Sequence, residues 1–241
     1  MNEFGSDPPP EFSSPPPPPS GPIDQEPAPG NPWEQRATLG FGGALIGAVR
    51  LFVTNPARAF EQTRRSGDYF SPLLFAILVG WVGTLLGHIG QFALQVSVLN
   101  ALPPEFRDQM ALYAMSSPAM LANNLVLTPF YLAVVLFIGS AIHHFSLMIV
   151  GALNESESGF EGTVRVNGYA LVSQLAHIIP FVGVLITVVW FVALQVIGAT
   201  RLHRTTSGRA LVAALIPWGL CCGCLVLLFT IMGAAIMSSF Q

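Results

Sequence analysis

Long apolar segments are separated by polar segments along this chain. Four apolar blocks, at about 70–98, 125–153, 168–200 and 210–237, contain no Asp, Glu, Lys or Arg. A helix rises about 1.5 Å per residue, so about 20 apolar residues cross the roughly 30 Å hydrocarbon core of a bilayer. Each block is long enough to cross. The pattern predicts an all-α, polytopic bundle of membrane helices over residues 67–241.

The third block is interrupted by Pro180-Phe181-Val182-Gly183. If this block is one kinked helix, the chain has four spans. If the block is a tight hairpin, with spans at about 167–181 and 183–200, the chain has five. With five spans and a cytoplasmic N-terminus, nine of the ten arginines lie inside and only Arg107 lies outside; four spans give six against four. The positive-inside rule favours five transmembrane helices in the cytoplasmic (inner) membrane, with the C-terminus on the opposite side.

The segment before the first block divides into two parts. Twelve of the twenty prolines lie in residues 1–35, and the six acidic residues before Arg36 are accompanied by no basic one. Such a composition cannot bury enough apolar surface to fold, so residues 1–37 are predicted to be a disordered, Pro-rich cytoplasmic tail. Residues 38–66 are predicted to form interfacial amphipathic helices, one of which starts at Pro56 behind an Asn55 cap.

Glycines mark one face of the first span. Gly80, Gly83, Gly87 and Gly90 recur at helical spacing, which lets another backbone approach closely in lipid. They predict packing against a second helix of the same chain or self-association. Gly219 and Gly223 in the last span repeat the spacing and are the expected partner.

Polar side chains also lie inside the predicted spans. The candidates for polar intramembrane contacts are His88, Gln91, His143, Gln174 and His177, and they are accompanied by Gln95, His144 and Gln195. A metal, a proton relay or a solute path is one interpretation, and hydrogen bonding between helices is the other. His88 and His177 fall in the outer half, whereas His143 and His144 fall in the inner half and point about 100° apart. We therefore expect hydrogen bonds between helices and no metal.

Common catalytic motifs are missing from the sequence. Apolar residues make up 52% and charged residues 10%, and no carboxylate lies in any predicted span. The sequence contains no phosphate loop, His-Glu-x-x-His or Gly-x-Ser-x-Gly. The three cysteines, Cys221, Cys222 and Cys224, share one apolar run and are expected to be small lipid-facing residues. We predict no catalytic residue, no cofactor and no enzymatic activity.

Several short patterns occur in a fixed order along the chain. They are Asn55-Pro56-x-x-Ala59-Phe60, Phe160-x-x-Thr163-x-x-Val166-x-x-Tyr169-Ala170, Pro180-x-x-Gly183, Trp190 with Gly198, and His203-x-x-x-Ser207-x-Arg209-Ala210. In these patterns the chain resembles the Yip family (Ypt/Rab-interacting proteins), particularly its bacterial members. The resemblance implies five spanning helices with a cytoplasmic N-terminus.

The resemblance also bears on function. Eukaryotic members of the family are implicated in vesicle traffic and contact prenylated small GTPases from the cytoplasmic side. The Asp-Leu-Tyr-Gly-Pro segment that they carry before the membrane does not occur in this sequence, so no residue role is transferred.

We expect a non-enzymatic interaction or membrane-organising module. Its cytoplasmic surface would comprise the tail, the basic pre-membrane helix and the loop Arg201–Arg209. The expected partners are the lipid bilayer and a protein or a second copy of the chain, with no nucleic acid. The alternative is a small-solute transporter or channel that uses the broken 168–200 hairpin, with His88, Gln174 and His177 along its path.

Overall fold

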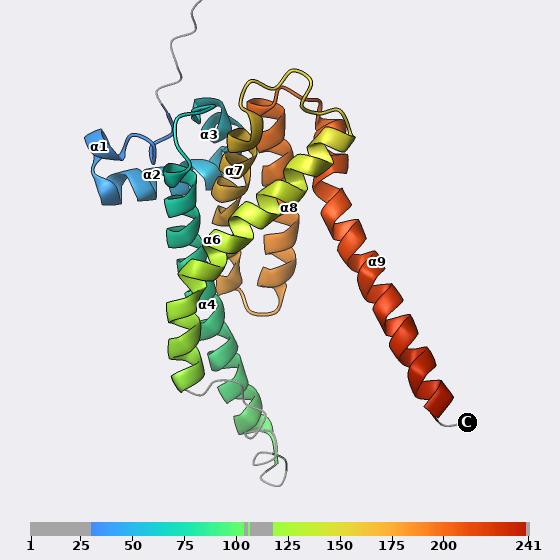
Figure 1. The fold of residues 1–241 in the computed structure, drawn as a ribbon. Coiled ribbons are helices and arrows are strands. Elements are labelled where there is room, and N and C mark those ends of the chain that lie inside the picture. The colour runs from blue at the N-terminus through green and yellow to red at the C-terminus, as the bar shows by residue number, and fades with distance from the viewer. Residues whose placement is uncertain (1–29, 104–105, 107–117, 240–241) are drawn as a thin grey trace, which may run out of the picture.

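The computed structural model of the chain describes residues 30–103, 106 and 118–239, and all regular elements in this part are helical (Figure 1). The predicted all-α class is confirmed. Three short helices come first: α1 (Arg36–Leu39), α2 (Phe41–Thr54) and α3 (Pro56–Gln62). The longer elements are α4 (Phe70–Ala101), α6 (Pro118–Ile149), α7 (Gly159–Ala170), the 3-10 helix η1 (Leu171–Ile178), α8 (Val182–Leu202) and α9 (Ser207–Ser239).

Four helices are long and apolar enough to cross a membrane. They cover Phe70–Ala101, Leu125–Ile149, Val182–Leu202 and Ser207–Gly233. Their outward-facing apolar side chains are extensively exposed, as the lipid-facing surface of a membrane bundle requires. The chain is therefore a multi-pass membrane protein.

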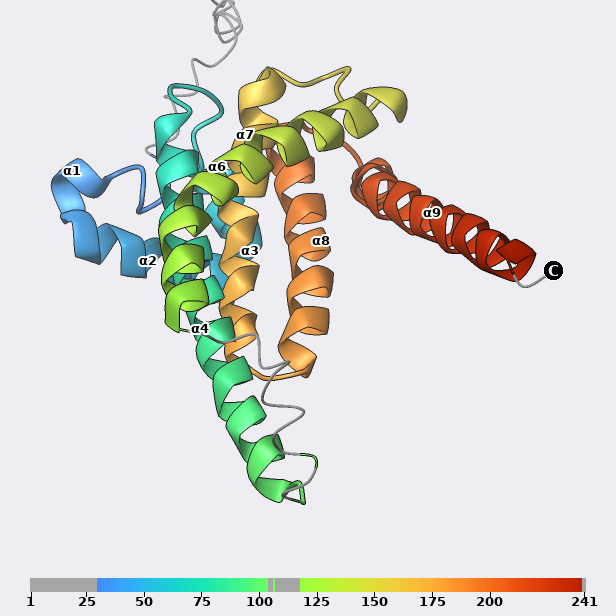
Figure 2. The same ribbon diagram turned by 60° about the horizontal axis from the view of Figure 1, so that its bottom comes forward.

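The interruption at Pro180 is a reversal of direction. Helix α7 continues into η1, and the backbone then turns so that α8 runs back beside η1 (Figures 1 and 2). Phe181 takes the turn with a φ of 63°. A Cβ atom at Gly183 would lie 2.4 Å from the Ala176 carbonyl oxygen, so only glycine permits this close approach. The α7–η1 segment is not among the four apolar helices, and it carries Glu161 and Arg165 in its first turns.

The predicted pre-membrane helices correspond to α2 and α3, which lie beside one end of the long helices (Figure 1). Asn55 caps α3 as predicted: its side-chain oxygen accepts a hydrogen bond from the Arg58 backbone N–H at 3.1 Å, and Pro56 is the first helical residue. Helix α2 buries Ala44, Ala48 and Phe52 on one face. This face fixes the pre-membrane helices to the bundle.

Residues 30–35 differ from the expectation of a solvated tail. Trp33 is fully buried, its indole N–H donates to the Ser71 carbonyl oxygen at 2.8 Å, and its ring packs against Phe41 and Phe75. The segment is held by contacts with residues far along the chain, which local composition does not encode. Residues 1–29, the rest of the predicted tail, lie outside the described part.

The largest core cluster draws on α2, α3, α4, α7, η1 and α8. Its centre is aromatic: Phe52 stacks on Tyr169 with ring centroids 4.9 Å apart, and Phe60 and Phe75 contact the edges of these rings. Offset and edge-to-face pairs of this kind stabilise a core by about 0.5–1.5 kcal/mol each beyond their buried area. The core therefore joins the pre-membrane helices to the bundle.

The glycine face of α4 packs against η1. A Cβ atom at Gly83 would lie 2.6 Å from the Gln174 Cβ, and Gly87 and Gly90 lie against His177 and Pro180. Gly80 lies against Leu132 of α6. The face therefore packs within the chain, which is one of the two interpretations of the glycine pattern.

The prediction that Gly219 and Gly223 pack against this face was wrong. A Cβ atom at Gly219 or Gly223 meets nothing within 4 Å in the described part, because α9 diverges from the other helices (Figures 1 and 2). The three cysteines lie on this exposed stretch of α9, and their side chains are exposed and unbridged.

Candidate functional site

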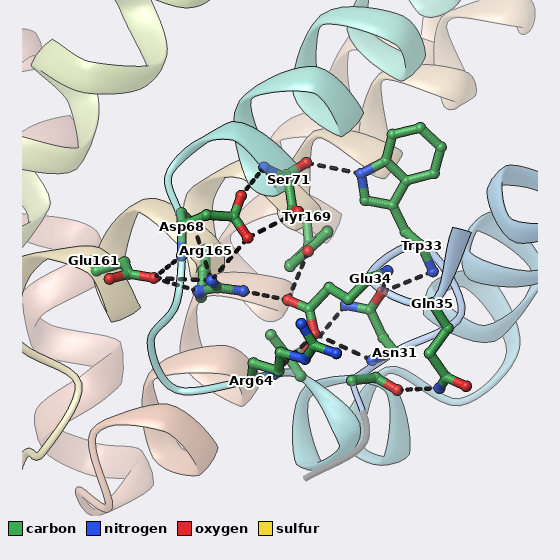
Figure 3. Close-up of polar contacts among 12 residues, drawn as sticks. Asn31, Trp33, Glu34, Gln35, Arg64, Asp68, Ser71, Glu161, Arg165 and Tyr169 are labelled. Atoms are coloured by element: carbon green, nitrogen blue, oxygen red, sulfur yellow. Dashed lines mark hydrogen bonds and ion pairs between the residues drawn. The ribbon is translucent and has the colours of Figure 1, made fainter. Parts of the chain in front are cut away.

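A buried ion pair ties the N-terminal segment to α7. The Arg165 guanidinium donates to Glu34 Oε1, and both side chains are at most 1% exposed (Figure 3). The Tyr169 hydroxyl donates to the same carboxylate oxygen at 2.9 Å, and the backbone N–H groups of Arg64 and Asn31 donate to Oε2 at 2.9 and 3.2 Å. Only donors surround the carboxylate, which suits its ionised form.

Two further carboxylates complete the surroundings of Arg165. Glu161, one helical turn earlier, accepts from the guanidinium at 2.8 Å, and Asp68 lies 3.8 Å away (Figure 3). Burial raises the pKa of the Glu34 carboxyl, while the Arg64 backbone N–H and the Arg165 guanidinium oppose this rise. The network is saturated by the chain itself, so we assign it to holding the fold.

A second polar cluster surrounds His203, where α8 ends. Its Nδ1 lies 2.7 Å from the Ser156 hydroxyl, and its Nε2 lies 3.0 Å from the Thr163 hydroxyl. The ring is fully buried, with the His144 ring centroid 6.3 Å away. Burial lowers the pKa of His203 to about 3, and the neighbouring histidines act in the same direction. His203 is therefore neutral near pH 7 and links the loop before α7 to the end of α8.

A basic cleft opens beside these clusters, between α3 and the loop that joins α8 to α9. It has a volume of about 420 Å³. Its polar and charged lining residues are Glu61, Thr63, Arg65, Thr200, Arg201, Arg204 and Thr205. The pre-membrane helix region and the Arg201–Arg209 loop both line this cleft. They are two of the three segments that the sequence predicted to form the cytoplasmic surface.

Among the described residues, the arginines of the basic cleft make exposed ion pairs. Arg201 contacts Glu61 at 3.0 Å, and Arg65 and Arg204 contact Glu157 at 2.8 and 2.9 Å. These side chains are 40–60% exposed. Exposed pairs contribute about 0–1 kcal/mol each, so opening them costs little free energy.

The five intramembrane candidates do not form one site. His88, Gln91 and His177 line a cavity of about 710 Å³ near the Pro180 turn. His143 and Gln174 line a different cavity, of about 280 Å³, to which α6, α7, η1, α8 and α9 all contribute. Gln174 therefore lines a different cavity from His88 and His177, the other two residues of the alternative solute path.

His143 and His144 of α6 each make a polar contact with α7. His143 Nδ1 lies 3.0 Å from Asn167 Oδ1, and His144 Nδ1 lies 2.8 Å from the Thr163 hydroxyl. No group of three His, Cys, Asp or Glu side chains within the described ranges could hold a metal ion.

In the sequence, Arg165 served only as evidence for the topology. Neither Glu34 nor His203 was predicted to make a buried polar contact. The i, i+4 spacing of Glu161 and Arg165 was the local signal for an ion pair. Glu34 lies 131 residues from Arg165, and no local pattern predicts that contact.

Comparison with known proteins identifies the family of the chain. The Yip1 domain family model matches residues 49–228, from the end of α2 through most of α9. No curated protein and no solved structure matches the chain. Because the family match covers well over half of the sequence, this multi-pass membrane protein belongs to the Yip1-domain family.

Proposed function

We propose that this chain is a non-enzymatic interaction module of the cytoplasmic membrane, whose basic cleft binds an acidic segment of a partner protein. Family membership supports a membrane protein without enzymatic activity. The observation that carries the proposal is the basic cleft, which is lined by Arg65 of the pre-membrane region, Arg201 at the end of α8 and Arg204 of the α8–α9 loop.

The proposal includes five spans, with α7 and η1 together forming the third. These two elements have 12 and 8 residues, and they lie beside α4 and α8 along the bundle (Figure 2). On this topology the basic cleft faces the cytosol, as the positive-inside rule favours. Protein partners and anionic lipid head groups are both available on that side.

Topology can be tested with a reporter cysteine at Thr205, after replacement of Cys221, Cys222 and Cys224. A thiol reagent that cannot cross the bilayer is expected to leave intact cells unlabelled at this position and to label it after permeabilisation. Labelling of intact cells would place the basic cleft outside and remove the proposal.

Partner binding can be tested by co-purification of the full chain in mild detergent, followed by mass spectrometry. Arg201→Glu with Arg204→Glu reverses the charge of the basic cleft and is expected to lower recovery of the specific partner at least tenfold. Arg58→Glu is the matched control, because Arg58 is exposed on α3 but does not line the basic cleft. Equal losses in both variants, or no loss in either, would contradict the assignment.

A further inference from the structure

The N-terminal segment enters the described part of the chain next to the basic cleft. Asn31 Nδ2 donates a hydrogen bond to the Thr63 hydroxyl at 3.0 Å, and Thr63 lines the basic cleft. Gly30 lies against Arg64, the neighbour of Thr63 in the chain: a Cβ atom at Gly30 would be 3.2 Å from the Arg64 Nε. Asn31 and Arg64 accordingly lie close together in Figure 3. The chain before Gly30 therefore joins the protein beside the basic cleft, whichever side of the membrane that end faces.

The chain before Gly30 has the charge that the basic cleft attracts. Residues 1–29 contain five acidic residues and no basic one: Glu3, Asp7, Glu11, Asp24 and Glu26. Glu26 and Asp24 precede Gly30 by four and six residues. An extended chain covers at most about 3.6 Å per residue, so these two carboxylates lie within about 14 and 22 Å of Gly30. Both can therefore reach the residues around Thr63.

The basic cleft has capacity for further carboxylates. Arg65, Arg201 and Arg204 pair with only two acidic side chains, Glu61 and Glu157, so one positive charge is in excess among these five residues. Each ion pair is made by the Nη1 atom of its arginine, and a guanidinium carries five N–H groups. An acidic segment can therefore bind these arginines while the existing ion pairs remain.

Covalent attachment favours the chain's own acidic residues over those of another protein. A binding segment on a short tether has an effective concentration on the order of millimolar at its site. Individual exposed ion pairs are weak, so a free acidic peptide gains little from the same contacts. The segment that precedes Gly30 is thus the favoured occupant in the absence of a partner.

We propose that the segment Asp24–Glu26 occupies the basic cleft of its own chain when no partner is bound. Its two carboxylates pair with the arginines of the basic cleft. The inference rests on the proposed function, because it makes this segment a competitor of the partner's acidic segment. The protein is then autoinhibited, and a partner has to displace Asp24–Glu26 before it binds.

Disulfide formation within the full chain tests this docking without any partner. One cysteine replaces Gln25, between the two acidic residues, and a second replaces Thr205 of the basic cleft. The natural cysteines, Cys221, Cys222 and Cys224, are first replaced by serine.

Thr38 provides the matched control site for the second cysteine. It is exposed and lies near the same point of entry, because its backbone N–H donates to the Gln35 carbonyl and the Gln35 side chain donates to the Gly30 carbonyl. The Gln25–Thr205 pair is expected to form its intramolecular disulfide about fivefold faster than the Gln25–Thr38 pair, on the scale of two exposed ion pairs.

Charge variants show whether ion pairs cause this preference. Asp24→Asn with Glu26→Gln is expected to slow the Thr205 disulfide to the rate of the Thr38 control, and Arg201→Glu with Arg204→Glu should do the same. Adding Asp24→Arg with Glu26→Arg to the second variant exchanges the charges and is expected to restore the faster rate. A loss caused by misfolding would not be restored in this way.

Co-purification from native membranes measures the competition. Asp24→Asn with Glu26→Gln, in the chain with its natural cysteines, is expected to raise recovery of the partner by up to about fivefold, because the basic cleft is then open. Recovery of no partner from either protein would end the proposed function, while the disulfide rates would still decide whether Asp24–Glu26 docks.

Four outcomes would overturn the inference. They are equal disulfide rates at Thr205 and Thr38, disulfides that form only between two chains, an unchanged Thr205 rate in Asp24→Asn with Glu26→Gln, and no gain in partner recovery in that variant.

Discussion

The two ends of the helix bundle are built on different physical principles. At the end that carries α3 and the start of α7, the chain buries an ion pair, a neutral histidine and an aromatic cluster. Towards the other end, α4 buries no residue after Gly83, and α9 buries none after Ala214 among the residues described.

The difference follows from the solvent at each end. Where water is present, apolar burial stabilises the fold, and charges and polar groups can be satisfied in networks. In lipid, helices gain little from burying apolar side chains, because the acyl chains are equally apolar. Stability should therefore be concentrated at the arginine-rich end, and substitutions of the same type should have unequal effects at the two ends.

The largest effect is expected for Arg165→Met, which leaves the buried Glu34 carboxylate without its cation. Breaking a buried ion pair in this way costs about 3–5 kcal/mol of unfolding free energy, measured by SDS titration in detergent micelles. Adding Glu34→Leu should restore much of the loss, because neither charge then remains buried. Arg209→Met, at an exposed position, is the control. Equal effects of Arg165→Met and Arg209→Met would show that the ion pair does not stabilise the fold.

Trp33→Ala tests whether the segment at residues 30–35 is part of the core. Removing a fully buried tryptophan is expected to lower the unfolding free energy by about 3–5 kcal/mol. Phe130→Ala is the matched control on the lipid-facing surface, since Phe130 is 71% exposed, and should cost below about 1 kcal/mol. A similar cost for both aromatic side chains would remove the distinction between the two ends.

His203 should make stability fall in acid. The folded state holds the pKa of His203 near 3, below its ordinary value of 6.5, so the unfolded chain binds the additional proton between these values. Stability is therefore full above pH 6.5 and decreases as pH falls towards 3. At pH 4.5 the loss is about 2–3 kcal/mol, two pH units at about 1.4 kcal/mol each. In His203→Asn this part of the pH dependence should disappear, and an unchanged pH profile would argue against a buried neutral ring.

The smallest effect compares two glycines of the same sequence pattern. Gly83→Ala places a Cβ 2.6 Å from Gln174 Cβ and is expected to cost about 1–2 kcal/mol through overpacking. Gly219→Ala meets open space and should be neutral or slightly stabilising, because alanine is the better helix former. If Gly219→Ala were the more harmful change, α9 would have a partner, and self-association through α9 could be measured directly.

Much of the fold could be predicted from the sequence, because its strongest signals are local. Continuous apolar blocks predicted α4, α6, α8 and α9, and the Asn55-Pro56 pair predicted the start of α3. The Pro180–Gly183 interruption identified the turn. The small-residue pattern identified a packing face on α4 but not its partner, because Gly219 has the same spacing without the same surroundings.

The candidate site was predictable only in part. The concentration of arginines indicated that the pre-membrane helix and the Arg201–Arg209 loop lie on the same side of the membrane. The basic cleft, which both segments line, agrees with this prediction. Burial of Trp33 and Glu34 could not be predicted, since both follow a run of prolines and their partners lie far along the chain. The pairing of Asn167 with His143 and Gln195 likewise depends on three helices that meet only in the fold.

The 131-residue separation between Glu34 and Arg165 has a consequence for biosynthesis. Glu34 leaves the ribosome long before its cation is made, so its carboxylate must remain hydrated while the first helices enter the bilayer. The ion pair between Glu34 and Arg165 can form only once α7 is in position, which makes it a late step of maturation. A factor that held the nascent N-terminus would therefore delay closure of this end of the protein without preventing insertion of the helices.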